Sequence, residues 1–160
     1  MRVLPTDPGP RLIVNCDGAA RGNPGPAGIG AVVATPDGRV LAEIAEGIGV
    51  ATNNVAEYRA AIAGLARVRE LGGRVVLVRS DSRLLVEQLA GRYRVKNPTL
   101  IKLHLEVRRL MQEFDSVWFE HVPREQNKHA DKLANRGVDE WLAGAGRGYR
   151  PSGPPPGLFD

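Results

Sequence analysis

The order of hydrophobic patterns along the chain constrains its fold more than any other feature. Three strand-like segments, residues 11–16, 28–34 and 40–48, follow one another across short turns rich in Gly and Pro. After residue 52, helical and strand-like patterns alternate. Consecutive strands on short turns form an antiparallel meander, whereas strands separated by helices pair in parallel. The sequence therefore predicts an α/β fold with one five-stranded mixed sheet, three antiparallel strands and then parallel strands, flanked by helices.

Apolar residues at helical or strand-like spacing define the elements of the second half. The predicted helices cover residues 52–71, 84–89, 100–114 and 127–141. Two further strands are predicted at residues 74–79 and 116–122. The first of these is a continuous apolar run, which is typical of a strand buried on both faces.

Length and composition indicate one domain without a disulfide framework. The chain has 160 residues, a net charge of +4 and a single cysteine, Cys16, which we interpret as a small buried hydrophobe. We expect a flexible leader at residues 1–10, the folded domain at residues 11–142, and a Gly/Pro-rich disordered tail or linker stub at residues 143–160. The N-terminus lacks a secretory signal and no apolar run approaches the ~20 residues of a membrane span. We therefore expect a cytoplasmic monomer that does not bind membranes.

Four acids stand at comparable places in these elements. Asp17 ends the first strand, Asp81 ends the fourth, Glu57 lies in the first turns of the first long helix, and Asp131 lies one turn into the last helix. Each acid also has a purely structural interpretation. Asp17 suits a turn, Glu57 has capping-pair spacing from Asn54, Asp81 suits an N-cap, and Asp131 complements a helix dipole.

Together the four acids predict a metal site. If the first and fourth strands are neighbours, all four carboxylates can meet at one end of the sheet. Clustered carboxylates repel one another unless a cation is present, and ligand sets made only of oxygen suit Mg²⁺ or Mn²⁺. Two such ions can stabilise both the attacking and the leaving oxygens of a phosphoryl displacement. The residues therefore predict two-metal phosphodiester hydrolysis.

Four motifs, in the family's order, resemble those of type 1 ribonuclease H in its short-loop form. They occupy residues 17–28, 52–57, 80–82 and 127–134. The resemblance covers about residues 11–142 and implies the ribonuclease H-like fold. It also implies an endonuclease that hydrolyses the RNA strand of RNA–DNA hybrids with Mg²⁺ or Mn²⁺, two ions with substrate bound, and leaves 3′-hydroxyl and 5′-phosphate ends. The family's catalytic and metal-binding acids correspond to the following residues: Asp17, Glu57, Asp81 and Asp131.

The same resemblance implies nucleic-acid contacts. Gly18, Ala19 and Asn23 correspond to positions that contact the RNA minor groove, where 2′-hydroxyls distinguish RNA from DNA. The corresponding contacts to sugars and bases fall on Asn53 and Asn54, and those to a DNA phosphate on Thr52 and Asn97. Helix capping alone is the structural alternative for residues 52–54.

The sequence departs from the best-known bacterial pattern in two places. Residues 91–98 replace an extra basic helix, and their cluster of Arg92, Arg94 and Lys96 fits a DNA contact and a solvated face equally well. The bacterial relatives with that pattern also carry a histidine on a longer loop before the last helix, but this loop is short and no histidine aligns. Arg124 is the nearest residue, and the resemblance to short-loop members of the family implies that it meets the scissile phosphate as a candidate catalytic residue. The three histidines are interpreted as structural or surface residues: His104, His121 and His129.

Two other classes of function compete with this prediction. A non-catalytic nucleic-acid-binding module of the same superfold would usually lose acids, and all four are present. Another nuclease of the superfold, such as a resolvase or integrase, would lack the pattern of residues 52–54. Double-stranded RNA stays open as a second substrate.

Overall fold

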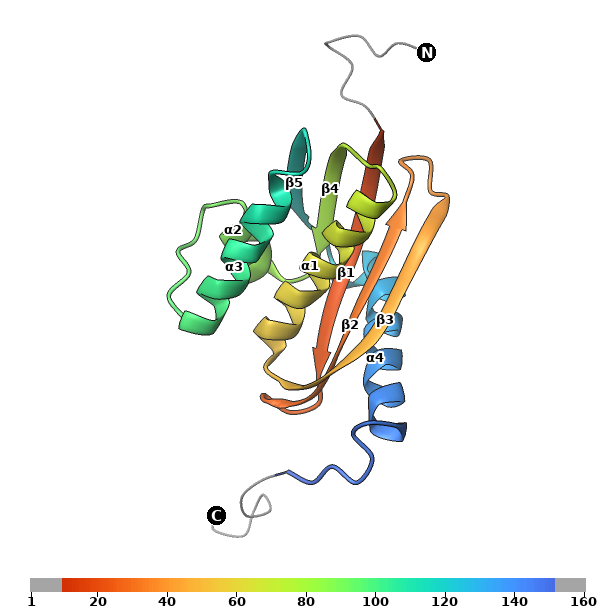
Figure 1. The fold of residues 1–160 in the computed structure, drawn as a ribbon, viewed down its shortest axis with the longest axis vertical. Helices are drawn as coiled ribbons and strands as arrows, with labels where there is room; N and C mark the ends of the chain where they lie inside the picture. The colour runs from red at the N-terminus through yellow and green to blue at the C-terminus, as the bar shows by residue number, and fades with distance from the viewer. Residues whose placement is uncertain (1–9, 152–160) are drawn as a thin grey trace.

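The computed structural model describes residues 10–151, which form one mixed sheet with helices on both faces (Figure 1). The strands are β1 (Arg11–Ala20), β2 (Gly25–Ala34), β3 (Val40–Ala51), β4 (Val75–Ser80) and β5 (Ser116–His121). The helices are α1 (Asn53–Glu70), α2 (Arg83–Leu89), α3 (Pro98–Met111) and α4 (Lys128–Ala143), and a short 3₁₀ turn, η1 (Arg124–Gln126), precedes α4.

The strand order across the sheet is β3-β2-β1-β4-β5. The first three strands are antiparallel neighbours, and β4 pairs in parallel with both β1 and β5. The predicted five-stranded mixed sheet is therefore confirmed. Because β1 is central, the strand that carries Asp17 lies directly beside the strand that leads to Asp81.

Three strands are longer than predicted: β2 begins at Gly25 rather than at residue 28, β3 ends at Ala51 rather than at residue 48, and the largest difference is at the end of β1. The first strand was expected to stop at residue 16, but β1 continues to Ala20 because residues 17–20 pair with residues 27–30 of β2. The pairing with β4 stops earlier, at Asn15 opposite Arg79. Asp17 is therefore paired with β2 on one side. On its other side the pairing with β4 has already ended.

Helices cover the two faces unequally. Helix α1 packs along β1 and β2 on the face it shares with α2 and α3, whereas α4 packs on the opposite face over β1, β2 and β3 (Figure 1). Glycines allow α1 and α4 to lie close to the sheet. Gly64 of α1 lies against Val14, and a Cβ at Gly30 of β2 would collide with the backbone of α4. The main hydrophobic core lies between the sheet and α1–α3.

The observed N-caps of α1 and α2 exclude two of the structural interpretations of the acids, the capping role of Glu57 and that of Asp81. Thr52 caps α1, accepting a hydrogen bond from the Val55 amide at 3.2 Å, so Asn54 and Glu57 do not form a capping pair. Ser82 caps α2 by accepting from the Leu85 amide at 3.2 Å, so Asp81 is not the N-cap. Both carboxylates are thereby free of a capping role.

The C-terminal part of the described chain folds back on α4. The amides of Gly144 and Gly146 donate to the Trp141 carbonyl, and the Tyr149 ring lies 6.1 Å from the Trp141 ring. The rest of the predicted tail, residues 152–160, and residues 1–9 of the predicted leader lie outside the described residues. None of the helices between residues 10 and 151 is long and apolar enough to cross a bilayer.

Candidate active site

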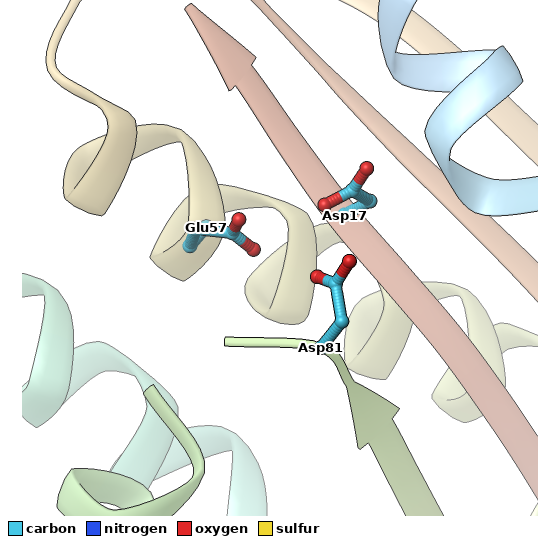
Figure 2. Close-up of side chains that lie close together, drawn as sticks. All are labelled: Asp17, Glu57 and Asp81. Carbon is cyan, nitrogen blue, oxygen red and sulfur yellow. The ribbon is translucent and has the colours of Figure 1, made fainter. Parts of the chain in front are cut away.

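Three carboxylates from different elements meet at the end of β4. Asp17 projects from β1, Glu57 from α1 and Asp81 from the residue after β4, and the three side chains point toward one another (Figure 2). One carboxylate oxygen from each lies within 4.8 Å of the others. The structure thus brings together three of the four acids that the sequence singled out.

The unequal pairing of β1 places Asp17. Beyond Asn15 this strand has no partner on its β4 side, because β4 ends at Ser80 and the chain turns into α2. The buried Ser80 hydroxyl accepts a hydrogen bond from the Ser82 amide at 3.0 Å, which fixes that turn. Asp81 is consequently held at the edge of the sheet beside Asp17.

A glycine brings Glu57 to the same edge. A Cβ at Gly18 would collide with the backbone of Ala56 and Glu57, so only glycine allows α1 to lie this close to β1. The Gly18 amide donates to Glu57 Oε2 at 3.2 Å and orients that carboxylate toward Asp17. Gly18, predicted as a substrate contact, therefore also has a structural task.

The cluster is electrostatically unfavourable by itself. Burial, followed by the charges of Glu57 and Asp81, raises the pKa of Asp17 to about 9. Burial and the charge of Asp81 likewise raise the pKa of Glu57 to about 8, against the lowering effect of its hydrogen bond from Gly18. Near neutral pH the site therefore favours a bound positive charge, which can be a proton or a metal cation.

Asp131 and Arg124 line the same hollow, which has a volume of about 280 Å³. Asp131 lies in the first turn of α4 and contributes to the raised pKa of Asp17, but it stands outside the triangle of close oxygens. Arg124 reaches in from η1, its Nε lying 3.8 Å from Asp81 Oδ2 while 86% of its side chain stays exposed. A long exposed cation is free to change partners when an anion enters.

A buried amide that the sequence analysis did not single out holds α4 in place. Asn127, only 1% exposed, donates from Nδ2 to the Cys16 carbonyl at 2.9 Å and accepts from Asn15 at 3.3 Å. These bonds fix the start of α4 to β1 directly before Asp17. The one available signal was its place at the head of the fourth motif, four residues before Asp131.

Most predicted nucleic-acid contacts surround a second hollow of about 220 Å³, whose lining includes four of them: Asn23, Thr52, Asn54 and Asn97. Thr52 caps α1, and Asn97 caps α3 through bonds from the Thr99 and Leu100 amides at 2.9 and 3.2 Å. Two helix N-termini therefore meet here, a geometry that favours an anion. Three further predicted contacts, Gly18, Ala19 and Asn53, line the carboxylate hollow instead.

Neither hollow is lined by the remaining sequence candidates, which are Arg92, Arg94, Lys96 and the three histidines. Residues 90–97 join α2 directly to α3, and Arg92 in this connector forms a bidentate ion pair with Glu87. His129 pairs with Glu43, and His121 lies 3.3 Å from the Asp81 carbonyl through its ring nitrogen. His104 is half-buried and its ring contacts the Gln88 carbonyl, so it is more enclosed than the expected helix-surface residue.

The donor set fits a divalent cation. All ligand atoms of the triangle are carboxylate oxygens, which suit Mg²⁺ or Mn²⁺ rather than zinc. The raised pKa values of Asp17 and Glu57 show that the fold holds these groups at a cost that a cation would remove. The sheet order and this cluster together define a protein of the ribonuclease H-like class.

Comparisons with known proteins agree. The family model described as reverse transcriptase-like matches residues 15–137. The bifunctional protein Rv2228c of Mycobacterium tuberculosis is 50% identical over 81% of this chain, and the chain spans 36% of that relative's length. Ribonuclease HI of Halobacterium salinarum is 42% identical, with 86% of this chain and 69% of that protein covered.

Solved structures extend the likeness to three dimensions. The N-terminal RNase H domain of Rv2228c has a TM-score of 0.79 at 50% identity, covering 81% of this chain and 99% of that one. LC11-RNase H1, solved in complex with an RNA/DNA hybrid, has a TM-score of 0.79 at 43% identity and covers 82% and 99%. The chain belongs to the ribonuclease HI family, and its members need a divalent metal.

Proposed function

We propose that this chain hydrolyses the RNA strand of RNA–DNA hybrids, leaving 3′-hydroxyl and 5′-phosphate ends. The observation that carries the proposal is the triangle of carboxylates from β1, α1 and β4, whose oxygens lie within 4.8 Å of one another. A relative of the same family has been solved with an RNA/DNA hybrid, which supports this substrate class.

The acids of the site are the proposed metal ligands. Asp17, Glu57 and Asp81 hold the divalent cations, which we propose to be two Mg²⁺ with Mn²⁺ as a substitute, and Asp131 completes the set from α4. When bound, such cations neutralise charge on the attacking and the leaving oxygens of a phosphoryl displacement. The hydrogen bond from the Gly18 amide keeps Glu57 oriented, and the burial of Asp17 keeps its carboxylate away from competing water.

The substrate is positioned by residues that line the two hollows. Gly18, Ala19 and Asn53 line the carboxylate hollow, where the RNA minor groove would lie over the metal ligands. Thr52 and Asn97 cap two helices at the second hollow, which suits a phosphate of the DNA strand. Asn23 and Asn54 complete that lining. The two hollows would thus engage opposite strands of one hybrid.

Arg124 supplies a mobile positive charge beside the scissile phosphate. Its side chain is 86% exposed and is within 3.8 Å of Asp81, so it can leave that carboxylate for a phosphate oxygen without disturbing the fold. We propose that it stabilises charge on the phosphate during cleavage. Arg124 lines the carboxylate hollow, and the connector of residues 90–97 carries three further cationic side chains, so hybrid binding should weaken as salt rises.

The deciding experiment is a cleavage panel. The chain is incubated with a labelled RNA–DNA hybrid and with matched DNA–DNA and RNA–RNA duplexes, first in Mg²⁺ and then in Mn²⁺. We expect internal cleavage of the RNA strand of the hybrid, and its loss in Asp17→Asn. Binding without cleavage would indicate a non-catalytic module, and cleavage of DNA would indicate another nuclease class.

The panel also decides whether RNA–RNA duplexes are substrates. The monomeric state and the cytoplasmic location stay predictions from the sequence. Because the chain spans about a third of its mycobacterial relatives, a tail that leads into a second domain also stays a prediction.

A further inference from the structure

A polar network joins the loop between β1 and β2 to the face of α4 that carries Asp131. Arg21, the first residue after β1, forms an ion pair with Asp139 of α4 at 2.7 Å. Its other terminal nitrogen donates to the carbonyl and the side-chain oxygen of Asn135 at 3.4 and 3.5 Å. The planar guanidinium therefore bridges two residues that are one helical turn apart.

Asn135 passes this contact on to Asp131. Its side-chain nitrogen donates to the Asp131 carbonyl at 3.0 Å and to Asp131 Oδ1 at 3.3 Å. With its oxygen held by Arg21, the amide of Asn135 presents its nitrogen to that carboxylate. Asp131 needs such support more than the other acids, because it lies at the exposed start of α4 rather than in the close triangle.

The same loop is also tied to α1. Asn23 Oδ1 accepts a hydrogen bond from the Asn53 amide at 3.0 Å, at the first residue of that helix. Residues 21–24 are thus anchored to α4 through Arg21 and to α1 through Asn23. These two helices carry Asp131 and Glu57. The loop lines the second hollow through Asn23 and directly follows Ala20, which lines the carboxylate hollow.

We propose that Arg21 and Asn135 are positioning residues that orient the Asp131 carboxylate toward the cations of the site. The inference rests on the proposed function, which it deepens by naming groups that act through Asp131. A hybrid that contacts residues 21–24 would therefore also contact the network that holds Asp131. Positioning of the Asp131 carboxylate is thereby linked to substrate binding at Asn23, in the loop of residues 21–24.

The network contributes little to the stability of the fold. The Arg21 and Asp139 side chains are 43% and 65% exposed, and ion pairs in such surroundings contribute little to folding. Groups that orient a metal ligand behave differently, since their removal typically costs 10- to 100-fold in metal affinity or activity. A functional loss without a loss of stability is therefore the expected signature.

A direct contact from Arg21 to a substrate phosphate is the competing explanation, and lysine separates the two. Lysine is a point charge that can contact either Asp139 or a phosphate, but it lacks the fork that bridges Asp139 and Asn135. Arg21→Lys should therefore behave like Arg21→Ala if positioning matters. It should behave like the wild type if Arg21 only binds phosphate.

The test uses the full chain with Arg21→Ala, Arg21→Lys, Asn135→Ala and the matched control Arg136→Ala. Arg136 lies in α4 and is likewise an exposed arginine, but its ion pair with Glu140 is separate from the network. We expect kcat on a labelled hybrid to fall about tenfold in the three network variants, with KM within about twofold and an unchanged salt dependence. Arg136→Ala should match the wild type.

A second readout needs no substrate. Mg²⁺ is titrated while the thermal unfolding midpoint is recorded, and the concentration for half of the maximal shift is determined. In the network variants this concentration should rise about fivefold or more, while the midpoint in EDTA stays close to that of Arg136→Ala.

Three outcomes are distinct. If the network variants match Arg136→Ala in kcat and in the Mg²⁺ titration, the inference is wrong. If Arg21→Ala instead raises KM, lowers the salt slope by about one and is rescued by Arg21→Lys, Arg21 is a phosphate contact and the inference is equally wrong. If the wild type does not cut the hybrid, the proposed function fails, and the Mg²⁺ titration still tests the network.

Discussion

Asp17→Asn should make the metal-free protein more stable at alkaline pH. The fold raises the pKa of Asp17 from 3.8 to about 9, so the folded state keeps a proton that the unfolded chain releases. Stability linked to such a group is fully present below the unfolded pKa and is lost as the pH rises through the folded pKa. Between about pH 4 and pH 9 the wild type therefore loses stability, and an amide at this position removes that loss.

The magnitude follows from the size of this interval. The interval from the unfolded pKa of 3.8 to pH 7 is about 3 pH units. Each unit is worth 1.36 kcal/mol, so the wild type loses about 4 kcal/mol of stability over this interval. Glu57 shares the same site and has its own pKa raised to about 8, so the two contributions are not additive. We expect the variant to gain about 2–4 kcal/mol at pH 7 to 8.

The assay is urea denaturation in EDTA at pH 6, 7 and 8. The free energy of unfolding of Asp17→Asn minus that of the wild type should increase with pH, by up to about 1.4 kcal/mol per unit. Added Mg²⁺ should stabilise the wild type and reduce this difference, because the cation takes the place of the proton.

Asp37→Asn is the control for this experiment. Asp37 lies in the exposed turn between β2 and β3, and a hydrogen bond from Thr35 lowers its pKa. This group is ionised in both states throughout the measured range, so its difference from the wild type should stay flat from pH 6 to pH 8. A flat difference for Asp17→Asn as well, or a variant less stable than the wild type at pH 8, would refute the electrostatic reasoning.

Three further substitutions test the construction of the site. Gly18→Ala would push α1 away from β1 and carry Glu57 with it, and should cost about 1–3 kcal/mol in urea denaturation and abolish hybrid cleavage; wild-type stability would contradict the close approach. Asn127→Ala leaves the buried Cys16 carbonyl without its side-chain donor and should cost about 1–3 kcal/mol, with Mg²⁺ affinity reduced. Arg124→Ala should lower turnover at unchanged thermal midpoint, and an unchanged turnover would exclude a role in cleavage.

The fold was largely predictable because its signals are local. Short Gly/Pro turns between the first three strands indicate antiparallel neighbours, and a strand–helix–strand pattern indicates parallel pairing. The boundary of β1 was not predictable in this way. Residues 17–20 are small and include no bulky apolar side chain, and they become strand only because β2 pairs with them on one side.

The acids of the site were predictable as residue types but not as a geometry. Sequence alone left Glu57 open as half of a capping pair and Asp81 as an N-cap, and the structure assigns both caps to neighbours, Thr52 and Ser82. The separation of Asp131 from the close triangle was also invisible, since it depends on where α4 crosses the sheet. The support of α4 by Asn127 and Arg21 was missed for the same reason.

What the sequence determined by itself is the order of elements and the chemistry of the side chains, both of which depend on neighbours along the chain. Only the tertiary structure decided which carboxylate oxygens share one site, how far burial raises the pKa of Asp17, and which polar groups hold α4 against β1. Those properties arise between residues up to 118 positions apart, as for Arg21 and Asp139. Distances and solvation at that range are set by packing, which no local pattern records.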